Sequence, residues 1–388
     1  MEHIIRSLLI MEDRHLHIIC FDVPLPADYG GAIDEFYKIK TLHEAGIKLH
    51  LHCFVYNRPP HTDLENYCAT VNYYKRHNDF NHFSFRLPFI VNSRKNPELI
   101  ANLSQDNYPV LIEGIHCSYA LFDGKLTDRK VMLRLHNAEF EYYHTLGAHE
   151  KNPLKKFYFN HESKLLKKYE AGLASKVKIA AVSERDIKLY KNNFEPADID
   201  HLPAFTAFDT AKGVEGKGCF CLYHGNLAIN ENEEAAVWLL KHVFKDLDIP
   251  FVIAGKNPSE RLRFLAEENA HICLVSNPAE DELQDMIAKA QIHIIPSFNT
   301  TGIKLKLLNA LYNGRHCLVN KAAVQGSGLE GICQVAEEAE EFKTAIGYLY
   351  NIPYTTAENA DRQITLDRLY NNKKNLEKIT DFFWGADN

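Results

Sequence analysis

The chain has 388 residues, of which 24% are charged, and its formal net charge at pH 7 is -7. A single hydrophobic core rarely extends over so many residues, so the length predicts two domains. The acidic balance excludes a broad positive surface, and no nucleic-acid partner is expected.

The N-terminal segment MEHIIRSLLIMEDRH contains an apolar stretch that is interrupted by Arg6 and flanked by acidic residues. It lacks the small-residue cleavage site of a secretory signal and is too short to cross a bilayer. We therefore expect a short surface helix. No later apolar run reaches the length of a membrane span.

Short β-rich apolar runs alternate with longer helical patterns along the rest of the chain, which is typical of parallel α/β sheets. The strands predicted in the first half are residues 15–23, 47–55, 109–114, 130–137 and 178–183. Those predicted in the second half are residues 219–226, 249–255, 271–276, 290–297 and 315–320. Residues 201–218 are rich in proline, glycine and threonine without periodicity, which predicts a linker.

Each half repeats one arrangement, in which a strand is followed by a polar loop with glycine and then by a long helix. The loop and helix span residues 23–46 in the first half and residues 223–244 in the second. In open parallel sheets, ligands bind beyond the carboxyl ends of the strands, where such loops gather. The expected fold is therefore two Rossmann-like parallel-sheet domains facing a cleft.

Residues 152–178 form a basic amphipathic pattern with two interpretations. The first is an ordinary helix that packs on the core and exposes its lysines, and the second is a helix that contacts an anionic membrane. Glu162 and Glu170 dilute the positive face, which favours the first. The residues expected to share the apolar face are Leu154, Phe157, Tyr158, Leu165, Tyr169 and Leu173.

The segment SFNTTGIKLKLLNALYNG, residues 297–314, follows an apolar strand, and its leucines recur at helical spacing. A helix is predicted to begin near Gly302, where free amide groups and the helix dipole favour an anion. Lys304 and Lys306 point about 200° apart on such a helix, so only one should reach that anion. We favour Lys304 because it lies nearer the helix start. The alternative is a tight turn with two solvated lysines.

The nine cysteines are scattered through mostly apolar runs, which indicates buried thiols in a reducing, cytoplasmic compartment. The twenty histidines include no HExxH motif, and several of them alternate along predicted strands. Structural or surface roles are therefore expected for the histidines, and no metal is predicted.

Four segments, in this order, resemble glycosyltransferase family four, whose members are retaining enzymes of the GT-B fold. The first two are PADYGGAIDEFYKIKTLHEAGIKLHLH and LRLHNAEFEYYHTL. The others are HGNLAINENEEAAVWLLKHVF, followed by FVIAGKNP, and IIPSFNTTGIKLKLLNALYNGRHCLVNKAAVQGSGLEG. The resemblance implies domains at residues 1–204 and 205–365, and a C-terminal helix at 366–388 that crosses back to the first domain.

The resemblance also implies that the C-terminal domain holds a nucleotide-diphosphate sugar and that the N-terminal domain holds a glycan or lipid-linked acceptor. Transfer would proceed with retention, without metal or cofactor, in polysaccharide biosynthesis, and contact with the inner membrane stays open. His136 matches the catalytic-face histidine that touches the transferred sugar. The expected donor-binding residues are Gly30, Gly31, Gly225, Asn226, Lys256, Thr300, Thr301, Gly302, Ile303, Lys304 and Asn309.

The sequence departs from the family in the acidic and in the basic residues of the donor site. Thr301 and Asn309 stand where the family has a glutamate at each end of its donor helix. Asn226 stands where an arginine is common, and Asn230 to Asn232 stand where a lysine is common. Lys256, Lys304 or Arg134 could replace the missing basic residues. Three functions therefore remain open: an active glycosyltransferase, a nucleotide-sugar epimerase, or a non-catalytic scaffold in glycan assembly.

Overall fold

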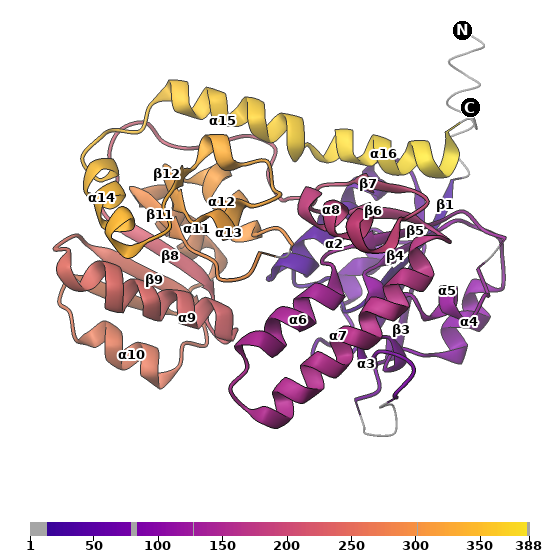
Figure 1. Cartoon of the computed structure of the whole chain (residues 1–388). Helices are drawn as coiled ribbons and strands as arrows, with labels where there is room; N and C mark the ends of the chain where they lie inside the picture. Colours follow the sequence, from indigo (N-terminus) through magenta and orange to yellow (C-terminus); the bar gives the residue numbers. More distant parts are fainter. Residues whose placement is uncertain (1–13, 79–83, 127, 301, 386–388) are drawn as a thin grey trace, which may run out of the picture. The chain divides into compact units, whose positions relative to one another are not determined.

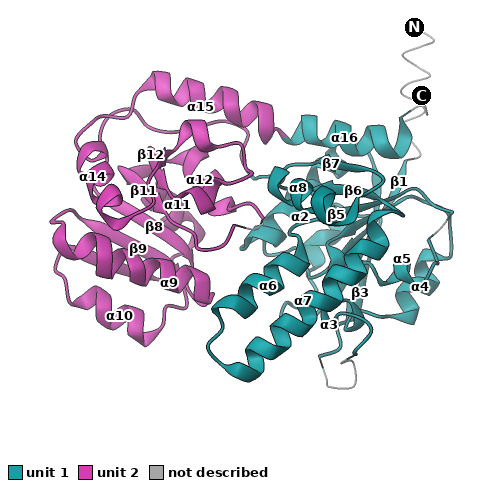
Figure 2. Cartoon of the chain, viewed as in Figure 1, with its two compact units in different colours: residues 1–207, 372–388 teal, residues 208–371 magenta. Residues whose placement is uncertain are grey.

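The structure is a computed structural model that describes residues 14–78, 84–126, 128–300 and 302–385 (Figure 1). The chain forms two compact units (Figure 2). Unit 1 comprises residues 1–207 and 372–388, and unit 2 comprises residues 208–371. Among the described helices, none has the length and apolar character needed to span a membrane. The surface helix predicted at the N-terminus lies outside the described residues.

Unit 1 contains a seven-stranded sheet with the order β3-β2-β1-β4-β5-β6-β7, and every pairing in it is parallel. The strands are β1 (His15–Cys20), β2 (Lys48–Val55), β3 (Thr70–Lys75), β4 (Val110–Glu113), β5 (Val131–Leu135), β6 (Lys178–Ala181) and β7 (Ile199–His201). The α-helices are α2 (Gly30–Glu44), α3 (Phe89–Asn92), α4 (Pro97–Leu103), α5 (Tyr119–Phe122), α6 (Glu139–His149), α7 (Pro153–Ala174), α8 (Glu184–Phe194) and α16 (Asn372–Trp384). Two 3-10 turns cover Thr62–Asn66 and Ile115–Cys117.

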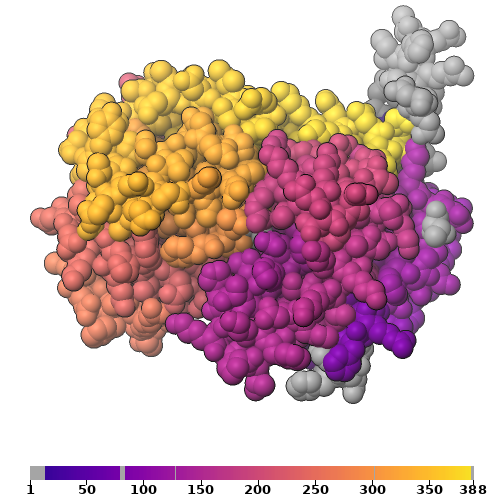
Figure 3. All heavy atoms as spheres, in the orientation of Figure 1, coloured from indigo at the N-terminus to yellow at the C-terminus, as the bar shows by residue number. Residues whose placement is uncertain are grey.

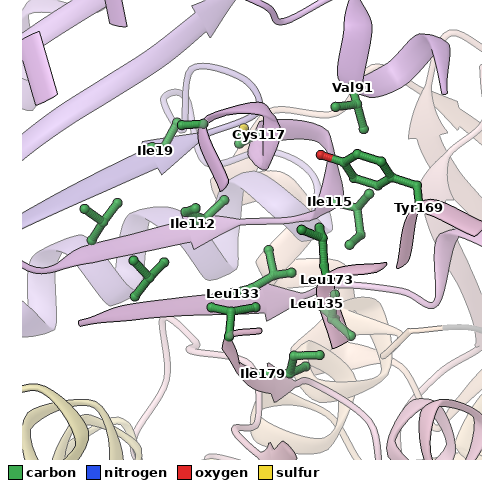
Figure 4. Packing of buried hydrophobic residues seen from close by; sticks show 14 of the residues in the cluster. Ile19, Val91, Ile112, Ile115, Cys117, Leu133, Leu135, Tyr169, Leu173 and Ile179 are labelled. Carbon is green, nitrogen blue, oxygen red and sulfur yellow. The ribbon is translucent and has the colours of Figure 1, made fainter. Parts of the chain in front are cut away.

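Helices cover both faces of the unit 1 sheet. Successive apolar side chains along each strand therefore point in turn into one helical layer and the other. On one face, Leu133 and Ile179 of the sheet belong to the same core as Tyr169 and Leu173 of α7 (Figure 4). On the other face, the core includes residues of α2 and α16, among them Leu42. The C-terminal helix α16 is therefore part of the core of unit 1.

Unit 2 contains a six-stranded parallel sheet with the order β10-β9-β8-β11-β12-β13. The strands are β8 (Cys221–Asn226), β9 (Phe251–Lys256), β10 (Ile272–Ser276), β11 (Ile292–Ile295), β12 (His316–Val319) and β13 (Gln334–Val335). The α-helices are α9 (Asn230–Trp238), α10 (Glu260–Glu267), α11 (Glu280–Lys289), α12 (Leu305–Asn313), α13 (Lys321–Val324), α14 (Ala339–Leu349) and α15 (Thr356–Leu369). A π-helical turn, Leu239–Val243, continues α9, and 3-10 turns cover Phe244–Asp246 and Glu330–Ile332. The predicted pair of parallel-sheet α/β domains is confirmed.

Histidines of β1 and β2 form a hydrogen-bonded row on one face of the unit 1 sheet. His17 Nε2 lies 2.9 Å from Asp106 Oδ1, and His17 Nδ1 lies 2.9 Å from His52 Nε2. His52 Nδ1 then lies 2.8 Å from the Tyr74 hydroxyl. Because the carboxylate only accepts, His17 donates to Asp106, His52 donates to His17, and Tyr74 donates to His52. Every member is satisfied while both imidazoles are neutral.

This row predicts a loss of stability in acid. Burial lowers the pKa of His17, and burial lowers the pKa of His52 to about 3. Below pH 6.5, His17 and His52 therefore bind more protons in the unfolded chain than in the folded chain, so the contribution of these two histidines to stability falls as the pH falls. The pKa shift of His52 alone should lower the free energy of unfolding by about 2 kcal/mol between pH 7 and pH 5. Urea unfolding at both pH values should show a smaller acid loss for His52→Gln than for the parent protein.

Candidate functional site

Four segments of unit 2 meet at the carboxyl edge of its sheet: the end of β8, the first turn of α9, the loop after β11, and the start of α12. Ser297 Oγ donates to Glu231 Oε1 at 2.9 Å, which joins the β11 loop to α9. Lys306 Nζ donates to Asn232 Oδ1 at 2.8 Å and to the Tyr223 hydroxyl at 3.2 Å. Lys306 thus connects α12 to both α9 and β8.

Helix α12 begins at Leu305, so the prediction that it begins near Gly302 is wrong by three residues. The reason is the backbone of Gly302, whose φ of 64° is left-handed and incompatible with an α-helix. Ile303 and Lys304 therefore belong to the connection before the helix. Lys304 is the N-cap, and its side chain forms no capping bond. The helix start still presents amide groups that lack an intrahelical acceptor.

The two lysines of this segment have different surroundings. Lys304 Nζ lies 3.6 Å from Glu231 Oε1, so it already has a carboxylate partner. Lys306 is half-buried, its hydrogen-bond partners are neutral, and its Nζ lies 4.7 Å from the centre of the Tyr223 ring. Burial lowers the pKa of Lys306 to about 7, although Glu231 opposes that change. An incoming anion would therefore gain most from Lys306, which the sequence did not favour.

The other residues expected to bind the donor are distributed along the same edge of the sheet. Gly225 and Asn226 end β8, and the Asn226 carbonyl accepts from Asn232 Nδ2 at 2.9 Å. Lys256 ends β9 opposite Asn226 and is exposed. Asn309 lies deeper along α12, where its Oδ1 accepts from Asn313 at 2.8 Å. Thr300 precedes α12 and is half-buried, and Thr301 falls outside the described residues.

In unit 1, His136 follows β5 and lies among buried charges from β4 and α2. His136 Nε2 lies 2.8 Å from Glu113 Oε2, and His136 Nδ1 lies 3.7 Å from Asp34 Oδ2. Lys38 Nζ is 2.7 Å from Glu113 Oε1, and Arg134 Nη2 is 3.0 Å from Asp34 Oδ2. Both ring nitrogens of His136 thus face carboxylates, which fix the orientation of the imidazole.

The buried cluster shifts the pKa values of two glutamates in opposite directions. Burial alone would raise the pKa of Glu113, but Lys38, His136 and Arg134 outweigh it and hold that pKa below its usual value. Glu35 lies on α2 and is 1% exposed, and neither of its carboxylate oxygens has a hydrogen-bond partner among the described residues. Burial, and then the charge of Glu113, raises the pKa of Glu35 well above its usual value. The cluster therefore favours the ionised form of Glu113 and the protonated form of Glu35.

Asp34, Glu113 and His136 are the described residues that come close enough to share a metal ion, with ligand atoms within 4.8 Å of one another. Their chemistry fits an ion poorly. Lys38 and Arg134 already balance the two carboxylates, and the nearest nitrogen of His136 is bonded to Glu113. A divalent cation would have to displace these buried cations at a high electrostatic cost.

Gly30 and Gly31 are the first two residues of α2, whereas the sequence suggested a loop. This helix start has no side-chain cap and no acidic residue in its first turn, so its amide groups remain available to an acceptor. A Cβ at Gly31 would lie 2.9 Å from Phe21 Cζ and 3.1 Å from Tyr29 Cε2. A larger residue at position 31 would therefore force the Phe21 or Tyr29 ring to move.

The sequence did not single out Glu113 or Glu231, whose carboxylates hold side chains together at the two sites. Glu113 ends an apolar strand, where a lone acid next to a glycine is a usable signal. Glu231 and Asn232 lie in the first turn of α9, where an acidic residue is usually explained by the helix dipole. Only the folded chain shows that they meet Ser297 and Lys306.

Comparison with known proteins identifies the fold. No family model matches the chain. An uncharacterized 44.6 kDa protein in the cps region of Klebsiella pneumoniae is 28% identical over 358 residues, which cover 86% of this chain and 91% of that protein. Sucrose-phosphate synthase from Thermosynechococcus elongatus has a similar structure, with a TM-score of 0.69, 12% identity and coverage of 95% and 97% of the two chains. A TarM mutant of S. aureus, solved with UDP, has a TM-score of 0.63, 10% identity and coverage of 96% and 100%. The chain therefore has the GT-B fold.

Proposed function

We propose that the protein transfers a sugar from a nucleotide-diphosphate sugar to a glycan or lipid-linked acceptor. One observation carries the proposal: Lys306 lies half-buried beside an amide-bearing helix start, with neutral hydrogen-bond partners and a pKa of about 7. A site of this kind suits the diphosphate of a donor. The fold agrees, because a similar structure of TarM contains UDP.

In this proposal unit 2 binds the donor and unit 1 binds the acceptor. Negative charge develops on the leaving diphosphate, and Lys306 together with the first amides of α12 would stabilise it. His136 would contact the transferred sugar in an orientation fixed by Glu113. Retention of configuration, independence of metal and a cytoplasmic location in polysaccharide biosynthesis are part of the same proposal.

A non-catalytic scaffold is the second candidate, and Glu231 favours it. Its carboxylate accepts from Ser297 and lies 3.6 Å from Lys304, so a negative charge already stands beside the proposed diphosphate site. Such a charge weakens the binding of an anion unless the donor displaces it. A scaffold would tolerate this arrangement because it has no need to bind a donor.

A panel of UDP, GDP and ADP sugars separates the candidates. We expect one sugar nucleotide to raise the melting temperature of the protein, because a ligand that binds only the folded state stabilises it. The same compound should then be hydrolysed slowly without an acceptor. The absence of a shift with every member would favour the scaffold, and interconversion of the sugar would favour an epimerase.

The pH dependence of donor binding tests Lys306 directly. The ammonium form binds the diphosphate, and binding raises the pKa of Lys306 above its free value of about 7. Affinity should therefore fall by up to about tenfold per pH unit as the pH rises above 7. Calorimetric titration with the sugar nucleotide found in the panel measures this decline. Lys306→Arg, whose charge persists at these pH values, should bind with little pH dependence.

A further inference from the structure

An exposed apolar patch lies at the first half of α7. It consists of Leu154 and Phe157 of the helix and of Phe85, which lies in the segment before α3. These are the most exposed large hydrophobic residues in the described part of the chain, at 76%, 79% and 73%. The ring of His161 links two of them, since its centre lies 5.6 Å from that of Phe85 and 6.3 Å from that of Phe157. Exposed apolar side chains that gather at one place mark an interaction surface.

The exposed side of α7 is also strongly basic. With about 100° per residue, Phe157, Lys164 and Lys168 lie within about 40° of one another on the helix. The buried side, which includes Leu166, Tyr169 and Leu173, lies on the opposite face. The helix and the residue before its N-cap contribute these exposed lysines: Lys151, Lys155, Lys156, Lys164, Lys167 and Lys168.

The acids of α7 do not offset this charge, contrary to the expectation from the sequence. Glu162 and Glu170 are fully buried and accept hydrogen bonds from the backbone amides of Phe89 and Phe140. Burial raises the pKa of Glu162 to about 7, and burial also raises the pKa of Glu170. The outward face of α7 is therefore positive as well as apolar.

The acids nearest the hairpin between α6 and α7 are also engaged. Glu150 is half-buried and accepts from the Asn152 amide at 2.8 Å. Glu141 lies on α6, 3.8 Å from Arg185. Figure 3 shows the atoms of α6 and α7 in magenta at the surface of unit 1. Within residues 139–174, every exposed Lys, Arg, Asp or Glu side chain is therefore a lysine.

We propose that the outward face of α7, with Phe85, docks on an anionic lipid bilayer. Leu154 and Phe157 would enter the boundary between headgroups and acyl chains, and the lysines would contact the acidic headgroups. The chemistry favours lipid over an acidic protein, because apolar side chains surrounded by flexible lysines suit a soft, charged interface. The proposal is independent of the donor site in unit 2.

Sedimentation of the full chain with vesicles tests the proposal. We expect binding to vesicles that contain phosphatidylglycerol and little binding to pure phosphatidylcholine. Leu154→Ser with Phe157→Ser should weaken binding by about tenfold or more. Lys164→Glu with Lys168→Glu should weaken it by more than about tenfold, since each lysine contributes about fivefold. High salt should also weaken the binding of the parent protein to the anionic vesicles.

Matched controls come from unit 2. Phe264→Ser with Ile364→Ser removes apolar residues that are 65% and 68% exposed, and Lys241→Glu with Lys245→Glu reverses two exposed lysines. Both control variants should bind vesicles like the parent protein. Equal loss in the controls, or unchanged binding of the α7 variants, would overturn the proposal. Binding that responds only to salt would show a general attraction to anions and would overturn it too.

Tryptophan fluorescence measures whether the α7 side chain at position 157 enters the bilayer, independently of the binding affinity. Phe157→Trp places an indole at an exposed position, and its emission should shift to the blue with anionic vesicles. Ile364→Trp is the control on α15 and should show no shift. A Phe157→Trp variant that sediments with vesicles but keeps the emission of an indole in water would contradict docking through this face.

Discussion

Replacing Lys306 with methionine is expected to abolish the thermal shift caused by the sugar nucleotide and to lower kcat/KM for transfer by about 10²–10³-fold. The magnitude is that of removing one preorganised donor to a developing oxyanion. Methionine retains most of the volume of lysine, so the contact with the Tyr223 ring survives without the charge. Because burial disfavours the ammonium group, the fold itself should lose little stability.

The control for this variant is Lys304→Met, two residues away. Lys304 lies beside Glu231, so its removal takes away one cation but also frees a carboxylate near the site. We expect a loss of donor affinity of less than about tenfold, consistent with a partly solvent-screened pair. A larger loss for Lys304→Met than for Lys306→Met would reverse the assignment and restore the expectation from the sequence. Both affinities are measured by calorimetric titration with the same sugar nucleotide.

The strands at the centre of each sheet could be predicted from the sequence, but several edge strands could not. β1, β4 and β5 are apolar runs because both faces of the sheet are covered by helices. β3 and β7 lie at the two edges of the unit 1 sheet and contain polar residues and few buried ones. Their positions are set by pairing with a neighbouring strand, which is not visible in local composition.

The strand-to-helix junction at which we propose donor binding could be predicted, whereas the side chains that meet there could not. The strand-to-helix junction after β11 is a local pattern, but the left-handed φ of Gly302 moves the helix start to Leu305. The partners of Lys306 lie 74 and 83 residues away in the chain. Local spacing therefore ranked the two lysines by their distance from a helix start. It could not show that Lys304 meets a carboxylate whereas Lys306 has neutral hydrogen-bond partners.

The charged cluster of unit 1 shows the same limit. Asp34 and Arg134 are separated by 100 residues in the sequence, yet their side chains pair at 3.0 Å. The resemblance to the glycosyltransferase family singled out His136, but gave no reason to connect it with Glu113 or Lys38. The three come together because β4 and β5 are neighbours in the sheet and α2 covers that face.

Glu113→Ala is expected to destabilise unit 1 by about 3–5 kcal/mol, because it leaves Lys38 buried without its closest partner. Glu113 Oε1 lies 2.7 Å from Lys38 Nζ, and both side chains are 1% exposed. His136 also loses the carboxylate that holds its Nε2. Urea unfolding, followed by a signal from unit 1, measures this loss.

The double variant Glu113→Leu with Lys38→Met decides between an unpaired charge and lost packing. It removes both charges but keeps similar volumes, so it should recover most of the stability that Glu113→Ala loses. Asp34 lies 3.7 Å from Lys38 and retains Arg134 at 3.0 Å, which leaves no new unpaired acid in the double variant. If the double variant were as unstable as Glu113→Ala, the cluster would stabilise unit 1 through the shape and hydrogen bonds of Glu113, and the charge of Lys38 would be incidental. Recovery of stability without recovery of sugar transfer would then assign Glu113 to the positioning of His136.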